Sequence, residues 1–239
     1  MKPDMNAGSK MHDYFKTINN ETAYWAGYIA ADGNIHSYHG GAGKILQFVV
    51  KIDDKPHLET FKQCIGCKNK IHEYDRLTSY SNGITKRYAH LNICKIKEIA
   101  NDLDRIYNIT EQKSNTLLPP TKLDGDLSLS YIKGIIDGDG TIRVNKSDNL
   151  NHRRPRMTLE IAGTKPLLIW ISKILGMIVD DKKERVYYDK ANKGSYRYII
   201  TGFKAEVILD RLHKVNTPEM MRKWNVVINE STYGNCDRY

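Results

Sequence analysis

Apolar residues recur at every second position in two stretches of this sequence. In residues 44–52 the intervening positions include Gln47 and Lys51, and in residues 156–161 they include Glu160. Alternation with a period of two and one apolar face is typical of a half-buried antiparallel strand. We therefore predict a strand over each stretch, with these polar side chains on the face opposite the core.

Two further pairs of short strands are predicted. Residues 69–77 and 87–93 form one pair, and residues 184–189 and 195–201 form the other. The connections contain Ser-Asn-Gly and Asn-Lys-Gly, residues that favour turns. Each pair is therefore predicted to be a hairpin.

The helices between these strands are recognised from their ends. Residues 55–65 and 165–175 both have proline near the start and glycine just beyond the end, the asymmetry expected of a helix. Further helices are predicted over residues 96–106 and 204–212. The sequence thus reads twice as α-β-β-α-β-β-α, which predicts an α+β fold of two similar halves. The predicted division is a first half over residues 1–109, a linker over 110–127 and a second half over 128–239.

An internal repeat supports this division. Residues 24–35 read YWAGYIAADGNI, and residues 131–142 read YIKGIIDGDGTI. Each copy has small residues four positions apart on one helical face, which lets two helices approach closely. We therefore predict that the two copies form a pair of packed helices. The small residues are Gly27 and Ala31 in the first copy, and Gly134 and Gly138 in the second.

Both predicted helices end at acidic residues. Gly33 and Gly140 suit the left-handed position that follows a helix, which places Asp32 and Asp139 at the two C-termini. A carboxylate there meets the partial negative charge of the helix end, which is unfavourable by up to about 1 kcal/mol. The same violation at two equivalent points indicates a functional site. A divalent cation would relieve it, and oxygen ligands favour Mg²⁺ or Ca²⁺.

At these residues the chain resembles the LAGLIDADG homing endonuclease family in its two-motif, single-chain form. Trp25–Gly33 and Ile132–Gly140 match the nine-residue signature, although the first copy has Ala30 where the signature has its earlier aspartate. Residues 113–120, Lys-Ser-Asn-Thr-Leu-Leu-Pro-Pro, resemble the family's lead-in to the second motif. The resemblance implies two halves related by a pseudo-twofold axis, with saddle-shaped antiparallel sheets and with the signature helices packed at their interface.

The resemblance also implies an activity, which is metal-dependent double-strand cleavage of a long, asymmetric DNA site by a monomer. Asp32 and Asp139 would bind the metal together with the backbone carbonyls of Ala31 and Gly138. We expect two or more Mg²⁺ ions, for which Ca²⁺ or Mn²⁺ can substitute. Four polar residues are expected to assist catalysis, namely Lys51, Glu160, Lys95 and Lys204.

The charge of the chain fits a nucleic-acid partner. It contains 37 Lys and Arg against 28 Asp and Glu, a net charge of +9, and such an excess favours a polyanion. The predicted strands and their connecting loops carry long polar side chains that suit base edges and phosphates. The expected DNA-binding residues are Gln47, Arg76, Arg87, Arg143, Lys146, Arg154, Arg156, Lys193 and Arg197.

Two other functions remain open on the same fold. An intron maturase would bind intron RNA with the same basic surface, and a DNA-binding protein without activity would be consistent with Ala30. Both catalytic acids are present, which favours the nuclease. The chain has no apolar run of transmembrane length and no secretory signal, so we expect a soluble intracellular protein without a membrane partner. Cys64 and Cys67 lack a second pair for zinc, so we expect reduced thiols.

Overall fold

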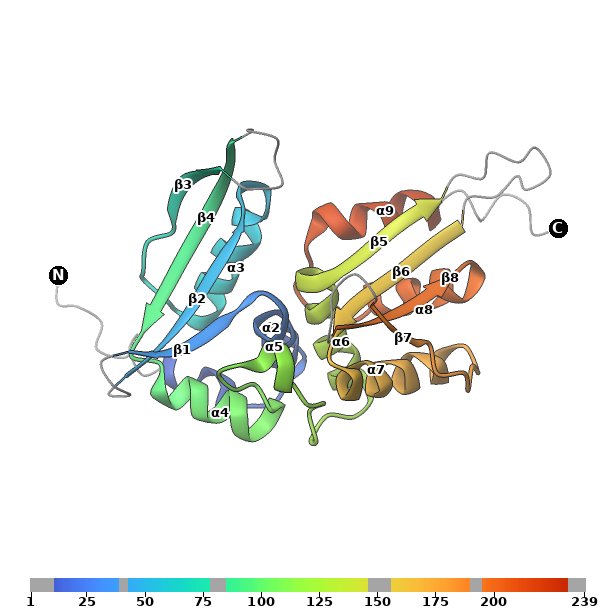
Figure 1. The fold of residues 1–239 in the computed structure, drawn as a ribbon, viewed down its shortest axis with the longest axis horizontal. Coiled ribbons are helices and arrows are strands. Elements are labelled where there is room, and N and C mark those ends of the chain that lie inside the picture. Colours follow the sequence, from blue (N-terminus) through green and yellow to red (C-terminus); the bar gives the residue numbers. More distant parts are fainter. Residues whose placement is uncertain (1–10, 39–42, 78–84, 146–155, 190–194, 232–239) are drawn as a thin grey trace.

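The computed structural model describes residues 11–38, 43–77, 85–145, 156–189 and 195–231. Two four-stranded antiparallel sheets form its framework (Figure 1). The strands run in the order β1-β2-β4-β3 in the first sheet and β5-β6-β8-β7 in the second. This arrangement confirms the predicted α+β fold class, with the same strand order in both halves.

The first half begins with the signature helix and alternates helices with pairs of strands. Two short 3₁₀ turns, η1 (Tyr14–Lys16) and η3 (Ile52–Asp54), precede α2 and α3. The elements are α2 (Asn20–Asp32), β1 (Asn34–Tyr38), β2 (Gly43–Lys51), α3 (Lys55–Ile65), β3 (His72–Leu77), β4 (Thr85–Cys94) and α4 (Lys97–Tyr107).

The second half repeats this order and ends with an additional helix. Its elements are α6 (Gly125–Asp139), β5 (Gly140–Asn145), β6 (Arg156–Gly163), α7 (Lys165–Ile178), β7 (Val186–Tyr188), β8 (Tyr196–Thr201), α8 (Phe203–His213) and α9 (Met221–Ser231). The short helix α5 (Lys113–Thr116) and the first residues of α6 lie within the segment predicted as a linker. Each half therefore has one helix more than the sequence pattern predicts, α5 in one and α9 in the other.

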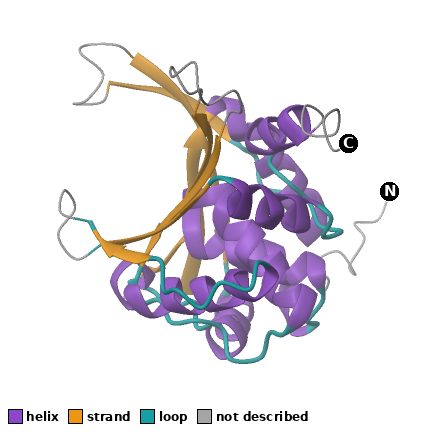
Figure 2. Ribbon diagram, turned by 90° about the vertical axis from the view of Figure 1, so that its right-hand side faces the viewer, coloured by secondary structure: helices purple, strands orange, loops and turns teal. Residues whose placement is uncertain are grey.

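The sheets and helices form two layers. Figure 2 shows the strands curving along one side of the molecule and the helices gathered on the other side. Alternate residues of the central strands, such as Leu46, Phe48 and Leu159, are buried against the helices. Their neighbours face the concave side, because successive side chains of a strand point to opposite faces.

Local sequence explains where the first helices begin and end. Asn19 caps α2 by accepting a hydrogen bond from the Thr22 backbone amide at 2.9 Å, and the Thr22 hydroxyl accepts one from the Asn19 amide at 3.0 Å. Helix α3 has proline in its first turn and ends at Gly66, whose φ of 72° is the left-handed conformation that glycine adopts readily.

The signature helices pack with their backbones in contact. A Cβ atom added at Gly27 would lie 2.0 Å from the Tyr131 carbonyl oxygen, and one added at Gly134 would lie 2.0 Å from the Tyr24 carbonyl oxygen. Any side chain at these two positions would force the helices apart. The predicted small-residue interface between α2 and α6 is therefore confirmed.

The glycines that follow these helices differ from the prediction. Gly33 and Gly140 have φ of −72° and −81°, which is extended backbone and not the left-handed conformation. Each helix passes directly into a strand, so no reversal of the chain is needed. Glycine is required there for space, since an added Cβ would lie 2.8 Å from the Ile29 oxygen or 2.6 Å from the Ile136 oxygen.

Candidate active site

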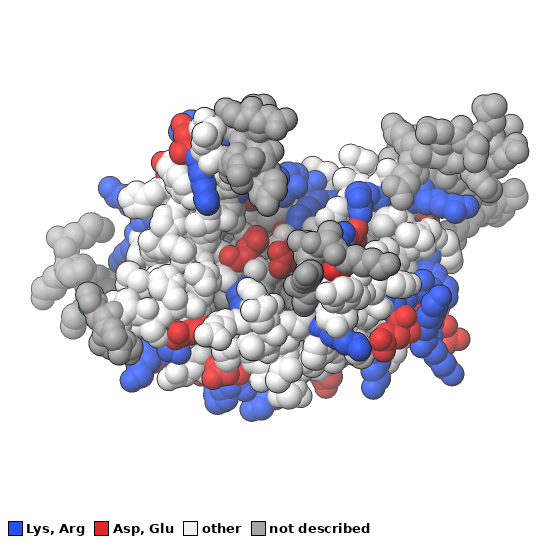
Figure 3. Space-filling model, viewed as in Figure 1, with Lys and Arg blue, Asp and Glu red and all other residues white. Residues whose placement is uncertain are grey.

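The two signature helices bring Asp32 and Asp139 together. These residues are the last of α2 and α6, and the Cγ atom of Asp32 lies only 3.4 Å from the position of a Cβ added at Gly138. In Figure 3 a group of acidic atoms lies in the hollow between the two halves, with basic atoms around it. The acidic helix ends thus meet at the base of the saddle, as the repeat predicts.

Each carboxyl group holds its proton more tightly than usual. Burial raises the pKa of Asp32 to about 6, and the neighbouring Asp139 carboxylate adds to the rise. Burial likewise raises the pKa of Asp139. A nearby cation stabilises the charged forms of two carboxyl groups that are partly desolvated and repel each other.

Two lysines, Lys113 buried and Lys223 half-buried, supply positive charge at these helix ends. The Lys113 ammonium, at the start of α5, donates to the carbonyl oxygens of Ala30 at 2.6 Å and Ala31 at 2.9 Å. The Lys223 ammonium, in α9, donates to three carbonyl oxygens at the end of α6. These acceptors are Ile136 at 2.9 Å, Gly138 at 2.8 Å and Gly140 at 2.8 Å. A cation that binds the last carbonyls of a helix also offsets its dipole.

The lysines and the acids attract each other crosswise between the halves. Among the charged groups that lower the pKa of Asp32, Lys223 has the largest effect. Lys113 has the largest such effect on the pKa of Asp139. Burial in turn lowers the pKa of both lysines. Each ammonium therefore binds the carbonyls at the end of one signature helix and attracts the acid at the end of the other.

The sequence prediction missed both lysines. Lys113 lies in a short polar stretch predicted as a linker, and Lys223 lies outside every predicted element. Apolar residues at 220, 224 and 227 follow a helical period around Lys223, so a helix could have been predicted there. Another signal was available, because Lys113-Ser114-Asn115 and Lys223-Trp224-Asn225 share the pattern Lys-x-Asn just after the last helix common to each half. Extending the internal repeat to these segments would have aligned the two lysines.

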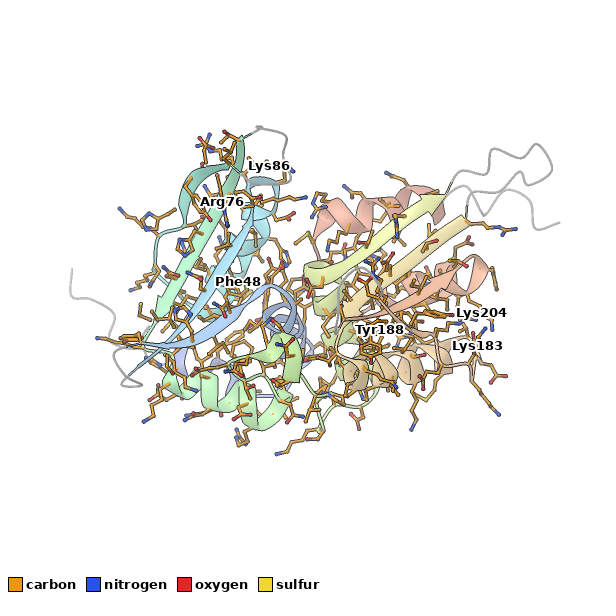
Figure 4. The ribbon with its side chains drawn as sticks, in the orientation of Figure 1. Phe48, Arg76, Lys86, Lys183, Tyr188 and Lys204 are labelled. Atoms are coloured by element: carbon orange, nitrogen blue, oxygen red, sulfur yellow. The ribbon has the colours of Figure 1, made fainter. Side chains whose placement is uncertain are left out.

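The lysines predicted for this role lie elsewhere. Lys204 forms an ion pair with Asp181 at 3.1 Å and lies at the outer end of the second half, far from the signature helices (Figure 4). Lys95 follows the end of β4, three residues beyond Asn92. Lys204 is therefore not beside the acids, and the expected catalytic role of Lys95 stays a prediction. The lysines that reach the helix ends come from α5 and α9 and not from the turn after the last strand.

Strand register corrects another pairing. Asn34 and Thr141 are each the second residue after the terminal Asp, and they lie opposite Gln47 and Glu160 respectively. Gln47 is thus the counterpart of Glu160, and both lie beside the helix ends. Lys51, expected to assist catalysis like Glu160, lies four residues further along β2 than Gln47, opposite Tyr88. Alternation gives the face of a strand but not its register, which explains the error.

The counterparts Gln47 and Glu160 have different surroundings. The Gln47 amide nitrogen lies 3.1 Å from Asn92 Oδ1 and 3.0 Å from His90 Nε2. The Glu160 carboxylate accepts hydrogen bonds from Arg197, at 2.5 Å, and from Arg143. The polar cluster beside the first helix end is therefore neutral when His90 is neutral, whereas the second is an ionic network.

The predicted DNA-binding residues fall into three groups. Register and alternation put one group on the concave faces of the sheets, namely Gln47, Arg76, Arg143, Arg156 and Arg197. Arg87 shares the other face with buried Ala89 and bonds Glu73 at 2.7 Å, so it lies off the concave face. Figure 4 shows Arg76 and Lys86 near the end of β3 and β4, where they oppose each other. Lys146, Arg154 and Lys193 lie outside the described residues.

A cavity of about 240 Å³ opens beside the acids and is lined by Lys113, Asn115, Asp139 and Thr164, among others. Over the described ranges, no three His, Cys, Asp or Glu side chains are grouped to hold a metal ion. Cys67 and Cys94 are free thiols. No helix in the described part of the chain combines the length and the apolar character that crossing a membrane requires.

Solved structures with this fold are LAGLIDADG homing endonucleases. I-CpaMI bound to uncleaved DNA matches with a TM-score of 0.58 and 14% sequence identity, over 89% of this chain and 90% of its own. I-GzeII in complex with its DNA target matches with a TM-score of 0.58 and 12% identity, over 93% and 94% of the two chains. I-SmaMI bound to an uncleaved DNA target in the presence of calcium ions matches with a TM-score of 0.55 and 12% identity, over 91% and 93%.

The fold is therefore that of the LAGLIDADG homing endonucleases, in the single-chain form with two signature helices. No protein-family model matches the sequence, and no curated protein matches it. The family resemblance of the two short motifs is thus confirmed at the level of the whole fold.

Proposed function

We propose that this chain is a site-specific DNA endonuclease that hydrolyses one phosphodiester bond in each strand of a long, asymmetric target. One observation carries the proposal. Two acidic helix ends, each with a lysine ammonium on its last carbonyls, meet at the base of a saddle whose concave faces present arginine side chains. A duplex lying along the saddle would present one phosphate of each strand to this centre.

The donor set suits a hard divalent cation. Asp32 and Asp139 offer carboxylate oxygens at the two helix ends. The backbone carbonyls of Ala31 and Gly138 are proposed as further ligands, and each would share its oxygen between the ion and the ammonium of Lys113 or Lys223. Mg²⁺ is commonly held by one or two carboxylates, with water and phosphate oxygens completing its shell. We propose Mg²⁺ as the ion, in two or more copies, with Ca²⁺ or Mn²⁺ able to substitute. Such an ion activates water and polarises the phosphoryl group.

The remaining residues have separate tasks. Lys113 and Lys223 offset negative charge beside the reacting phosphates, where burial makes an ammonium more effective than it is in water. Gln47 and Glu160 orient water near the helix ends, because their strands place them opposite Asn34 and Thr141. The fixed geometry reduces the entropic cost of the reaction.

The concave faces are proposed to bind the duplex. Arg76, Arg143 and Arg156 are exposed there and suit phosphates or guanine edges. The same role is proposed for Lys146, Arg154 and Lys193. Each half, residues 1–109 and 128–239 joined by residues 110–127, would read one part of the site, so a monomer suffices. A DNA-binding titration against salt concentration should therefore show a steep loss of affinity.

Cleavage selection tests the function directly. The purified protein is incubated with a randomised DNA library and Mg²⁺, and the cut ends are sequenced. We expect one recurrent site with a break in each strand, and no cutting when EDTA is in excess. Specific DNA binding without any metal-dependent break would identify a DNA-binding protein, and tight binding of a structured intron RNA without cleavage would identify a maturase.

A further inference from the structure

The second signature helix buries two opposite charges on one face. Lys133 and Asp137 lie one helical turn apart in α6, and their exposed fractions are 1% and 0%. The equivalent residues of α2 are Ala26 and Ala30. Neither charged residue takes part in the chemistry proposed above. Buried charges are costly unless they are fully paired, so their contacts indicate what they do.

Both oxygens of Asp137 bind the start of helix α9. Oδ2 accepts from the Met220 backbone amide at 2.8 Å, and Oδ1 accepts from the Trp224 indole nitrogen at 2.7 Å. The Tyr24 hydroxyl of the first half also donates to Oδ2, at 2.6 Å. Met220 and Trp224 flank Lys223 on both sides. The Asp137 carboxylate therefore fixes the helical turn that carries the Lys223 ammonium.

Lys133 holds the connection that leads into the same turn. Its ammonium donates to the Val215 carbonyl at 3.2 Å, pairs with Glu219 at 3.1 Å and lies 5.1 Å from the centre of the Trp224 ring. His213 in turn lies 3.0 Å from Glu219. The segment between α8 and α9 is thus held at its beginning and at its end by one face of α6.

Arg222 adds a contact to the first half. Its guanidinium binds both oxygens of Asp54 at 2.8 and 3.0 Å, a bidentate pair that fixes orientation as well as distance. The residues before and after Lys223 are therefore both immobilised by charged partners.

The first half supports its lysine differently. Lys113 lies on the four-residue helix α5, and Ala30 offers no carboxylate beneath it. The chain after α5 is held through its backbone, because Thr164 donates to the Leu117 carbonyl at 2.5 Å and Asn108 donates to the Pro119 carbonyl at 2.6 Å. Two equivalent ammonium groups thus depend on unrelated contacts.

We propose that Asp137 is a positioning residue for Lys223, so that cleavage of one DNA strand depends on the contact between α6 and α9 while cleavage of the other does not. This inference rests on the proposed endonuclease function and adds to it a named cause of unequal strand cleavage. Asp137 acts through the backbone amide of Met220 and the indole of Trp224, and it does not touch the DNA.

Strand-resolved cleavage by the Asp137→Asn variant tests this. Asparagine has the same shape, but its amide nitrogen donates and cannot accept a hydrogen bond. Either the Met220 amide or the Trp224 indole therefore loses its acceptor. With each strand of the selected target labelled at its end, single-turnover cleavage of the Lys223-dependent strand should slow about 10- to 100-fold. Cleavage of the other strand and DNA affinity should change less than about twofold, because Asp137 contacts neither the other lysine nor the DNA. The comparison also excludes misfolding as the cause, since a loss of folded protein would slow cleavage of both strands equally.

A double variant shows whether the effect passes through Lys223. Lys223→Met identifies the dependent strand, and adding Asp137→Asn should slow that strand no further. Multiplied effects in the double variant would overturn the proposal, as would equal slowing of both strands by Asp137→Asn alone. Ser128→Ala is the matched control, since this buried α6 hydroxyl has no hydrogen-bond partner among the residues that the structure describes. Both strands should keep their rates in this variant.

The Trp224→Phe variant tests the positioning role of Asp137 if the Asp137→Asn variant does not fold. It keeps an aromatic ring and removes only the indole donor to Asp137, so the same strand should slow about two- to fivefold. An unchanged strand ratio in this variant contradicts the proposal. Failure of the proposed function has a different signature, because the wild-type protein would then cut neither strand.

Discussion

The two halves of this protein share a backbone plan but support it with different side chains. In the first half, the signature helix buries Trp25 and Tyr28 against the rings of His57 and Phe48. Ile132 and Ile135 take the corresponding places in the second half, where the notable contacts come from charged residues. The acid at each helix end and the facing lysine are nevertheless the same in both.

The comparison shows which contacts the site requires in both halves and which contacts can differ between them. Backbone contact between α2 and α6 is needed to bring the acids together, so glycine occurs in both copies at the crossing. Behind the crossing, aromatic packing and a buried ionic cluster serve equally well. The two active-site ends can therefore differ in rate and in their response to solution conditions.

The largest expected effect tests the part that the halves share. Asp32→Asn and Asp139→Asn should each reduce double-strand cleavage by about 10³-fold, because several kcal/mol of charge stabilisation is lost at one end of the site. Cleavage is measured on the selected target, with DNA affinity as the control, and affinity should stay within about threefold. Full cleavage by either variant would contradict the metal assignment.

Acid stability should distinguish the halves next. Burial lowers the pKa of His57 to about 4 from 6.5, so the unfolded chain binds one more proton between these values. Stability is then lost as pH falls from 6.5 to 4, by about 3 kcal/mol from this residue. In His57→Gln, the glutamine can still donate a hydrogen bond to Tyr24 but does not titrate. As pH falls from 6.5 to 4, the free energy of unfolding of this variant, measured with urea, should therefore rise by about 3 kcal/mol relative to that of the wild type. A constant difference between the two proteins across the range would show that His57 is not buried in neutral form.

The lysines should separate the halves by strand. Lys113→Met and Lys223→Met should each slow cleavage about 10²-fold, and each should slow a different strand, because the two ammonium groups face different acids. Single-turnover assays with separately labelled strands measure this. Slowing of the same strand by both variants would contradict the assignment of one lysine to each acid.

The shared helix crossing should be intolerant of side chains in both copies. Gly27→Ala and Gly134→Ala should each cost about 2 kcal/mol of stability, because the new methyl group overlaps a backbone carbonyl of the other helix. Urea denaturation measures the loss. Gly163→Ala is the control, since its Cβ would make ordinary contacts from 3.5 Å, and its stability should stay within about 0.5 kcal/mol.

The smallest effect concerns the concave face of the first half. Arg76→Ala should weaken DNA binding about three- to tenfold, whereas Arg87→Ala should change it less than twofold, because Arg87 is directed to the helix side and bonds Glu73. Equilibrium titration at fixed salt measures both. A larger loss for Arg87→Ala would reverse the assignment of faces on β4.

The sequence by itself determined the repeated architecture and the acidic helix ends. The alternation around Leu46 and Leu159, the small residues of the two copies and the residues Asp32 and Asp139 are all local patterns. Such patterns persist in the folded chain because they follow from the period of a strand or helix and from the space between two backbones.

Only the tertiary structure decided which other residues join the site. Lys113 and Lys223 are single polar residues on α5 and α9, and they reach the helix ends because these two helices dock there. Strand register makes Gln47 the counterpart of Glu160 and turns Arg87 to the helix side of its sheet. This register is set by contacts between distant segments. Local pattern fixes the type of an element, whereas long-range packing fixes its neighbours, and catalysis depends on the neighbours.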